Sequence, residues 1–198
     1  VPTHKVKENY KYSKKVNFNG TKNLIDTIIK YKKKPKLIFF SSTSHVYKTS
    51  KTFKKLREND KIFPISLYGK TKFLAENYIK KKLKNQKIKY CIGRIFSFTD
   101  KKQEKSFIIP ALFNKIRNSK NTIKLTGLNH YRDFLVIEDI SKAIEIICKK
   151  EVSGVINIGS GKKIFLGDIA NYFSKRFKKN VKLSYNKNKT SFLISDNK

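Results

Sequence analysis

The sequence predicts an α/β fold built on a parallel β-sheet. Short runs that are apolar throughout, such as "KLIFF" and "YCIGRIF", alternate with longer segments whose apolar residues recur at helical spacing. Continuous apolar runs are typical of strands buried on both faces of a parallel sheet, whereas half-exposed strands alternate polar and apolar residues. With 198 residues, the chain is long enough to bury a sizeable core.

In the first third of the chain we expect a helix, a strand and a loop. Segment 19–34 has a helical stripe of apolar residues, and Pro35 separates it from a predicted buried strand at 36–42. Residues 48–66 are mostly polar and are predicted to form a loop. The helical stripe consists of Leu24, Ile25, Ile28 and Ile29.

The middle of the chain repeats this order with a helix at 68–84 and a buried strand at 88–96. The residues that we expect this helix to turn inward are Phe73, Leu74, Tyr78, Ile79 and Leu83. Strands that alternate with helices in this way indicate βαβ units.

The second half predicts two more strands and three helices. A short helix at 107–118 is entered through Pro110, and 132–150 is predicted as a strand followed by a helix that Asp139 caps. A further strand at 154–161 precedes a last helix at 166–177.

The charge of the chain first suggests a nucleic-acid partner, since its formal net charge is +33. However, only five of its 47 basic residues are arginines, and the lysines are spread along every segment. Arginine has the planar fork that suits base and phosphate recognition. We therefore interpret the lysines as a solvated surface that attracts anionic ligands such as nucleotides, and we expect no specific nucleic-acid partner.

Two features bear on the location and completeness of the chain. No apolar stretch approaches the roughly 20 residues that cross a bilayer, and no signal-peptide pattern opens the sequence, so we expect no membrane partner. Cys91 and Cys148 lie in apolar segments, which predicts reduced core thiols and a cytoplasmic protein. Methionine is absent even at position 1, so we expect a fragment that is truncated at both ends.

The stretch "SSTSHVYK", residues 41–48, places hydroxyl and imidazole groups where a predicted strand ends. The next helix offers a partner, because Tyr68 and Lys72 are spaced i, i+4 and share one face. A lysine ammonium near a tyrosine hydroxyl lowers the pKa of the phenol. Such a tyrosine can act as a general acid or base toward an alcohol.

The order of motifs is more specific than any one of them. Asn-x-x-Gly-Thr in "NFNGT" precedes the strand hydroxyls and Tyr-x-x-x-Lys, and "GRIFS", "RDFLVIEDI" and "INIGSG" follow. In this order the chain resembles the extended short-chain dehydrogenase/reductase family, the NAD-dependent nucleotide-sugar epimerases, dehydratases and reductases. The resemblance runs from about Asn17 to the end of the chain.

This resemblance implies a Rossmann-like doubly wound parallel sheet, of which the chain carries the C-terminal part, with a small C-terminal substrate-binding region. Residues 1–100 would then form the C-terminal half of the NAD-binding domain. Residues 101–198 would be mainly substrate-binding, with a late strand and helix that return to the Rossmann sheet. The family also implies a homodimer formed through the helices containing 20–30 and 68–79.

The resemblance also assigns the catalytic residues. Tyr68 would be the acid/base, and Lys72 would bind the nicotinamide ribose and tune Tyr68. Thr43 matches the family's catalytic Ser/Thr, which also bonds the substrate hydroxyl.

Further residues are assigned to the cofactor and the substrate. Asn17, Ser41, Ser42 and Phe96, with Tyr68 and Lys72, would line the NAD or NADP site. Ser97 and Arg132, with Thr43, would contact a nucleotide-diphosphate sugar, since a guanidinium fork suits a diphosphate. His4 and His130 have no carboxylate or Cys partner at ligand spacing, so we expect no metal.

The two residues after Thr43 narrow the choice of reaction. Family dehydratases carry acidic residues at the positions of Ser44 and His45, and family decarboxylases carry a Glu at the second. Both classes are therefore disfavoured, which leaves a 4-epimerase or a reductase of a 4-keto sugar. His45 resembles the position of a catalytic Cys in epimerase-reductases; it is either a second proton-transfer group or a residue that fills the loop.

Departures from the family pattern leave other questions open. The Gly-rich dinucleotide fingerprint is absent from the 198 residues, so we expect the chain alone to bind NAD poorly and to be inactive. Lys48, Ser97 and Phe107 differ from the commoner family residues, which leaves the sugar and the base open. The competing interpretation is an inactive, lysine-rich protein of the same fold that binds polyanions or nucleic acid.

Overall fold

The computed structural model describes residues 9–185 and 190–197. The described chain forms two compact units, which we describe separately. The first unit takes in the described residues up to Lys48, then Arg57–Ile95 and Glu138–Ile158. The second takes in Thr49–Leu56, Phe96–Ile137 and the described residues from Gly159 onward.

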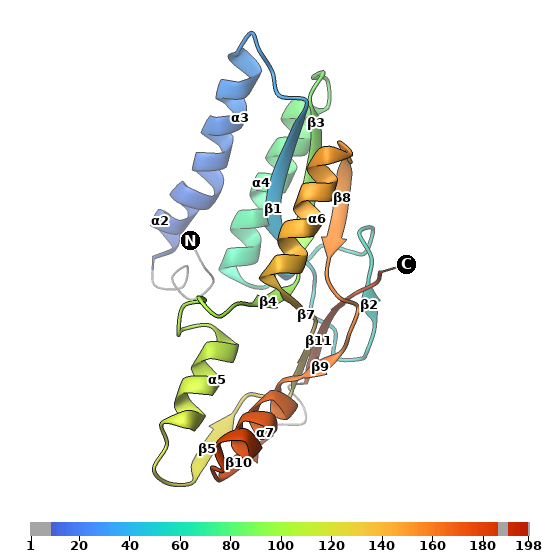
Figure 1. Cartoon of the computed structure of the whole chain (residues 1–198). Coiled ribbons are helices and arrows are strands. Elements are labelled where there is room, and N and C mark those ends of the chain that lie inside the picture. Colours follow the sequence, from blue (N-terminus) through green and yellow to red (C-terminus); the bar gives the residue numbers. More distant parts are fainter. Residues whose placement is uncertain (1–8, 186–189, 198) are drawn as a thin grey trace. The chain divides into compact units, whose positions relative to one another are not determined.

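The first unit is built on a three-stranded parallel sheet in the order β1-β3-β8 (Figure 1). Strand β1 spans Leu37–Thr43, β3 spans Lys89–Ile95 and β8 spans Gly154–Ile158. All three coincide closely with the predicted apolar runs. The α/β fold with a parallel sheet is therefore confirmed.

Helices cover both faces of this sheet. α3 (Gly20–Lys30) and α4 (Leu67–Leu83) pack on one face, where Ile25, Ile79 and Leu83 form a buried cluster with β1 residues. α6 (Ile137–Lys149) lies on the other face (Figure 1). Each helix follows the spacing of its apolar residues, because only one face of a helix meets the sheet.

The predicted inward position of Leu74 is wrong, and Leu24 of the predicted apolar stripe is exposed as well. Leu24 in α3 is 58% exposed and Leu74 in α4 is 38% exposed. Both belong to helical stripes that are wider than the surface the sheet covers, so spacing alone could not separate them from their buried neighbours.

The N-terminal part of the first unit contains a π-helical turn. α2 (Tyr10–Lys14) leads into the π-helix η1 (Lys15–Asn19), and α3 continues directly from it. Asn9 caps α2 by accepting a hydrogen bond from the backbone N–H of Tyr12 at 2.9 Å. Single π-helical turns within α-helices are frequent at functional sites.

The second unit contains three small sheets. The largest has four strands in the order β2-β11-β6-β9: Lys55–Leu56, Ser191–Ser195, His130–Arg132 and Ile164–Phe165. β5 (Ile123–Thr126) pairs with β10 (Val181–Ser184), and β4 (Ser97–Thr99) pairs with β7 (Phe134–Val136). The predicted loop 48–66 thus contributes the short strand β2.

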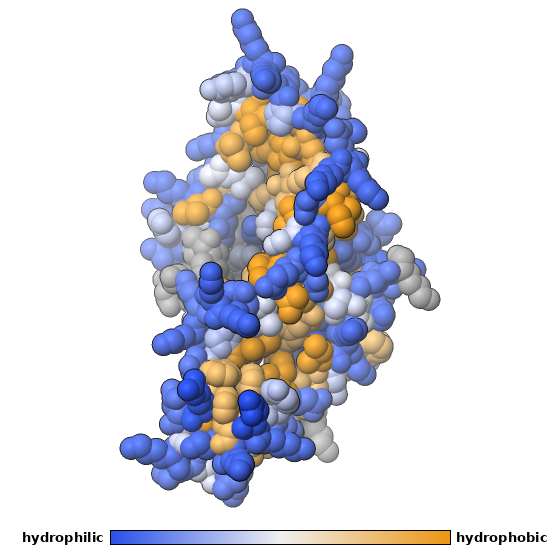
Figure 2. Space-filling model, in the orientation of Figure 1, coloured by the Kyte–Doolittle hydropathy of each residue, from blue (hydrophilic) through white to orange (hydrophobic). Residues whose placement is uncertain are grey.

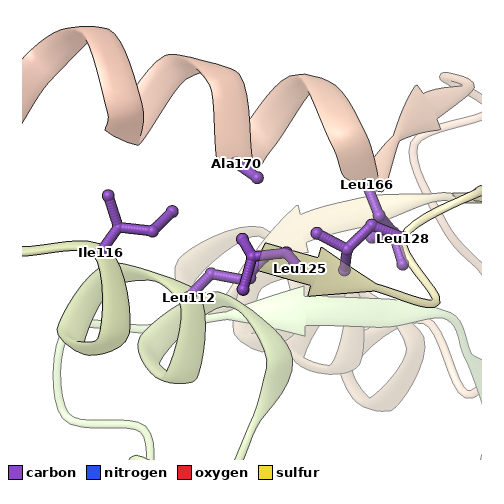
Figure 3. Close-up of a cluster of buried hydrophobic side chains, with 6 residues drawn as sticks. All are labelled: Leu112, Ile116, Leu125, Leu128, Leu166 and Ala170. Carbon is purple, nitrogen blue, oxygen red and sulfur yellow. The ribbon is translucent and has the colours of Figure 1, made fainter. Parts of the chain in front are cut away.

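The core of the second unit lies between two helices and the β5–β10 pair (Figure 3). α5 spans Ile108–Arg117, and α7 spans Leu166–Phe177, as predicted for 166–177. Pro110 is the third residue of α5 rather than its entry. The buried side chains of this core are Leu112, Ile116, Leu125, Leu128, Leu166 and Ala170.

Three further features concern single residues and the surface. α6 begins at Ile137, so Asp139 lies inside its first turn instead of preceding it as a cap. Cys91 is buried as predicted, whereas Cys148 is exposed because it lies on the outer side of α6. Hydrophilic side chains cover much of the face shown in Figure 2. In the described parts of the chain, no helix combines the length and the apolar character needed to cross a membrane.

Candidate active site

The polar end of β1 forms a tight turn around Thr43. Thr43 is the last residue of the strand and is 6% exposed. Its hydroxyl oxygen accepts a hydrogen bond from the backbone N–H of His45 at 3.2 Å and so caps the short 3₁₀ helix η2 (Ser44–Val46). The hydroxyl cluster therefore lies at the carboxyl end of a parallel strand, where α/β sheets bind ligands.

Helix α4 brings Tyr68 to this turn. Ser66 begins the helix by accepting a hydrogen bond from the backbone N–H of Gly69 at 3.0 Å. A Cβ atom on Gly69 would collide with the carbonyl oxygen of His45 and lie 3.2 Å from the Cβ atom of Pro64. A glycine at this position therefore lets the first turn of α4 approach η2 closely.

Tyr68 meets two of the predicted site residues. A side-chain hydrogen bond links it to Thr43, and its ring lies edge-on to that of His45 with 6.0 Å between centroids. Burial raises the pKa of the Tyr68 phenol, and the bond with Thr43 partly opposes this. The phenol is consequently protonated at neutral pH and can donate its proton.

Lys72 lies one helical turn after Tyr68. Its Nζ atom lies 4.7 Å from the centroid of the Phe40 ring on β1. Burial lowers the pKa of Lys72 to about 8, and the charge of Glu76 opposes this. Lys72 was expected to lower the pKa of Tyr68, but that pKa is raised. Burial is the largest influence on it, and the hydrogen bond with Thr43 acts in the opposite direction.

Asn17 approaches the same helix from the π-helical turn η1. Its side-chain amide donates a hydrogen bond to Thr71 Oγ1 at 3.2 Å, and the Thr71 hydroxyl donates to the carbonyl oxygen of Tyr68 at 2.8 Å. Asn17 thus contacts the backbone beneath Tyr68 through one intermediate side chain.

The two serines before Thr43 lie in different surroundings. Ser41 is exposed, whereas Ser42 is buried and donates its hydroxyl proton to the carboxylate of Glu76. The hydroxyl of Ser42 is therefore engaged within the protein.

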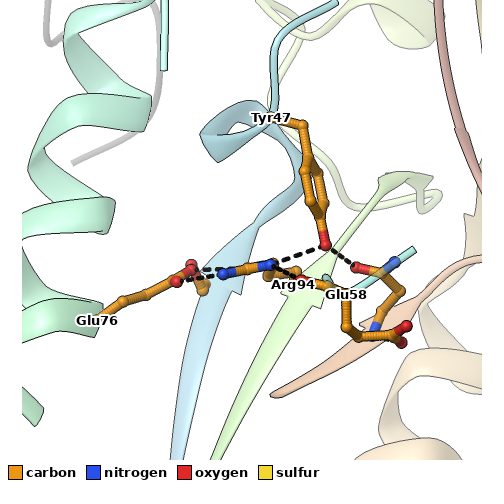
Figure 4. A network of polar contacts seen from close by, with 6 residues as sticks. Tyr47, Glu58, Glu76 and Arg94 are labelled. Carbon is orange, nitrogen blue, oxygen red and sulfur yellow. Dashed lines mark hydrogen bonds and ion pairs between the residues drawn. The ribbon is translucent and has the colours of Figure 1, made fainter. Parts of the chain in front are cut away.

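Sequence reasoning missed the buried ion pair that lies next to these serines (Figure 4). Glu76 Oε2 accepts from Arg94 Nη2 at 2.8 Å, and Glu76 Oε1 accepts from Arg94 Nε at 3.2 Å. Both side chains are almost fully buried. The available signal was the lone arginine in the apolar run "CIGRIF".

The far side of Arg94 is bonded to Tyr47, which follows β1, and to Glu58, which follows β2. Its Nη1 atom donates to Tyr47 Oη at 2.8 Å and to the carbonyl oxygen of Glu58 at 2.9 Å (Figure 4). Tyr47 in turn donates to Asn157 Oδ1 at 2.7 Å, and the backbone N–H of Asn157 donates to Glu58 Oε1 at 2.7 Å. The network therefore joins both neighbouring strands to α4.

The remaining predicted site residues belong to the second unit. Phe96 is 3% exposed, and Ser97 begins β4, where it pairs with Phe134. Arg132 donates from Nη1 to the carbonyl oxygens of Tyr131 and Ser191 at 2.7 and 3.2 Å. Burial lowers the pKa of Arg132 to about 10, so its guanidinium stays charged at neutral pH.

Asp133 is the centre of a hydrogen-bonded cluster in this unit. Its buried carboxylate accepts hydrogen bonds from the backbone N–H groups of Ser160, Gly161 and Ser195 at 2.7, 2.9 and 3.1 Å. The hydroxyls of Ser160 and Ser195 also donate to it. Asp133 therefore holds the "GSG" turn against the end of β11.

In residues 9–185 and 190–197, no group of three or more His, Cys, Asp or Glu side chains is placed to hold a metal ion. His130 Nδ1 lies 3.0 Å from the Ser191 hydroxyl oxygen. His4 lies outside the described residues.

Comparison with known proteins gives the family of the chain. The model of the NAD dependent epimerase/dehydratase family matches residues 3–159, which is more than half of the sequence. The chain belongs to the NAD dependent epimerase/dehydratase family.

Curated relatives carry several activities of this epimerase/dehydratase family. A Methanocaldococcus jannaschii protein assigned as a UDP-glucose 4-epimerase is 28% identical over 165 residues, covering 82% of this chain and 53% of its own. The dTDP-4-dehydro-6-deoxyglucose reductase of Escherichia coli is 31% identical over 137 residues, covering 66% and 42%. The chain thus spans about half the length of these relatives or less.

Solved structures support the Rossmann-like fold of the epimerase/dehydratase family. RMD from Pseudomonas aeruginosa complexed with NADPH has a TM-score of 0.86 at 17% identity, covering 98% of this chain and 68% of its own. UDP-glucose 4-epimerase from Thermotoga maritima with UDP-glucose has a TM-score of 0.82 at 20% identity, covering 98% and 64%.

Proposed function

We propose that the chain carries the proton-transfer site of an NAD(P)-dependent nucleotide-sugar epimerase or 4-keto-sugar reductase. The observation that supports this is the hydrogen bond between the Thr43 and Tyr68 side chains, with Lys72 one helical turn further along α4. Thr43 and Tyr68 meet at the carboxyl end of β1, the edge at which parallel α/β sheets bind ligands, and Lys72 lies over Phe40 of the same strand.

In this proposal Tyr68 exchanges a proton with the hydroxyl or carbonyl oxygen of the sugar. Because burial raises the Tyr68 pKa, the phenol is in its protonated form at neutral pH and is present as the proton donor that reduction of a ketone needs. Thr43 orients the same oxygen through its hydroxyl. His45, whose ring touches that of Tyr68, is a candidate for a second proton transfer.

NAD or NADP is the cofactor that we propose for this site. When bound, the nicotinamide supplies the hydride acceptor or donor for the sugar carbon. The Tyr68 hydroxyl and the Lys72 ammonium fit ribose hydroxyls, since both are donors beside the end of β1. The 198 residues contain no Gly-rich pyrophosphate loop, so the fit covers only the ribose and nicotinamide end.

We propose that the second unit mainly binds the nucleotide-diphosphate sugar. Arg132 keeps a positive charge in a partly buried position, which suits a diphosphate. The net charge of +33 would raise the local concentration of such an anion. The relatives that act on UDP- and dTDP-sugars agree with this substrate class.

The experiment that tests the function follows hydrogen from sugar to cofactor. Because the 198 residues lack a Gly-rich pyrophosphate loop, the chain is joined to the Gly-rich NAD-binding segment of a family member. The joined protein is incubated with NAD⁺ or NADP⁺ and UDP-glucose deuterated at C4, and separately with NADPH and a dTDP-4-keto-6-deoxy sugar. We expect either the C4 epimer with its deuterium still at C4, because the deuteride passes to the nicotinamide and back to the sugar, or reduction of the ketone with one NADPH consumed per product. If neither reaction occurs with either cofactor, the proposal is wrong.

The high charge supports one alternative, a catalytically inactive protein that binds polyanions. Binding through many lysines would weaken steeply as salt is raised. Tight, salt-sensitive binding of single-stranded RNA together with no hydride transfer would favour that alternative.

A homodimer is part of the proposed function, and α3 and α4 are its proposed interface. Both helices leave apolar side chains exposed, and Leu24 is 58% exposed. We expect Leu24→Glu to convert the dimer to a monomer, because the added charge would have to be buried. Light scattering coupled to gel filtration measures the mass.

The matched control for Leu24→Glu is Ile146→Glu on α6. Ile146 is similarly exposed, at 52%, but lies on a helix outside the proposed interface. This variant should stay dimeric. A Leu24→Glu protein with an unchanged mass would contradict the assignment.

A further inference from the structure

One face of α4 carries the proposed site and a buried acid. Tyr68, Lys72 and Glu76 are spaced four residues apart, so they lie along the same side of the helix. Glu76 is 0% exposed, which is rare for a carboxylate unless it is paired. The mechanism outlined above does not use this group.

The bonds of Glu76 lead from α4 to the strand that ends at Thr43. Ser42, the neighbour of Thr43, donates to its carboxylate, and Arg94 on β3 donates twice (Figure 4). Arg94 in turn donates a hydrogen bond to the hydroxyl of Tyr47. The central carbon of its guanidinium also lies 4.9 Å from the centroid of the Tyr47 ring. These contacts fix the register between the end of β1 and the helix.

We propose that Glu76 is a positioning residue of the proton-transfer site: it ties the end of β1 that bears Thr43 to the helix that bears Tyr68, and it is the counter-charge of the Lys72 ammonium. The inference rests on the proposed function, because Thr43, Tyr68 and Lys72 are assigned there.

The electrostatics agree with this geometry. Burial lowers the pKa of Lys72 to about 8, and Glu76 is the group whose charge opposes that effect. Other charged or titratable groups in these surroundings include His45 on η2, Arg94 on β3, and Asp26, Lys22 and Lys30 on α3. Lys80, on α4 itself, also feels the charge of Glu76. Asp26 is bonded to Tyr78 and paired with Lys22, and it is not among the groups that shift the Lys72 pKa.

The test measures the protonation of Lys72 directly. Trace acylation of the amines is carried out over a range of pH, and mass spectrometry gives the labelling midpoint of each lysine. In the unchanged protein we expect a midpoint for Lys72 of about 8. In Glu76→Gln we expect that midpoint at least about one pH unit lower, since an opposite charge is lost.

Glu145→Gln is the matched control. Glu145 also lies four residues from a lysine, Lys149, with 2.5 Å between charged atoms, but both side chains are exposed. Its loss should leave the Lys72 midpoint unchanged. In the active protein, the alkaline limb of the kcat profile of Glu76→Gln should move to lower pH with the Lys72 midpoint.

A second variant keeps the test valid if Glu76→Gln fails to fold, because that change leaves Arg94 buried without its partner. Glu76→Gln/Arg94→Met removes both charges at similar volume. We expect it to regain folding while the Lys72 midpoint stays below that of the unchanged protein. An unchanged midpoint in a folded variant overturns the inference. Labelling needs no turnover, so this failure is distinct from failure of the proposed function.

Discussion

Replacing Tyr68 by phenylalanine is expected to lower kcat by about 10²- to 10⁴-fold, the usual contribution of a positioned acid or base. The change removes only the hydroxyl that is bonded to Thr43. The ring remains against that of His45, so the packing at the start of α4 is preserved. We therefore expect a loss of stability of only about 0.5–1.5 kcal/mol, as for one hydrogen bond.

Tyr78→Phe is the matched control for this prediction. Tyr78 lies on the same helix and donates its hydroxyl to Asp26 at 2.5 Å, outside the proposed site. That variant should lose stability to a similar extent and keep its turnover. The measurement is steady-state turnover beside a thermal unfolding curve. A Tyr68→Phe protein with full turnover would exclude Tyr68 as the acid/base.

Replacing Asp133 by alanine is expected to destabilise the protein by at least about 3 kcal/mol. The change leaves the backbone N–H groups of Ser160, Gly161 and Ser195 without their buried acceptor. Each unsatisfied buried donor costs about 1–3 kcal/mol. Urea-induced unfolding, followed by circular dichroism, measures the difference.

Asp139→Ala is the comparison for Asp133→Ala. Asp139 lies in the first turn of α6 and is exposed, so its loss should cost only about 0.3–1 kcal/mol through the helix dipole. If the two variants unfold at the same urea concentration, the buried carboxylate does not hold the "GSG" turn as its hydrogen bonds indicate.

Much of the fold could be predicted because its signals are local. The continuous apolar runs became β1, β3 and β8, and the helix predicted at 166–177 is α7 with the same bounds. The exposure of Leu74, predicted to turn inward, and of Leu24 has a physical cause. A helical stripe says which residues share a face, but the width of the surface that covers it depends on elements elsewhere in the chain.

The candidate site was also only partly predictable from local sequence. The order of motifs named Thr43, Tyr68 and Lys72, yet it also suggested that Lys72 lowers the Tyr68 pKa. In the structure the Lys72 ammonium lies over Phe40, and burial raises the Tyr68 pKa instead. Rotamer and burial depend on neighbours from β1, which the spacing within one helix does not contain.

What the sequence by itself determined is the fold class, the family resemblance and the identity of the residues at the end of β1. These follow from periodicity and from the order of short motifs, both of which are properties of neighbouring residues. Only the tertiary structure showed the buried ion pair of Glu76 and Arg94 and the hydrogen bonds by which Asp133 holds the "GSG" turn. Each of these joins segments that are far apart in the chain, and a buried charge shows its role only once its partner is known.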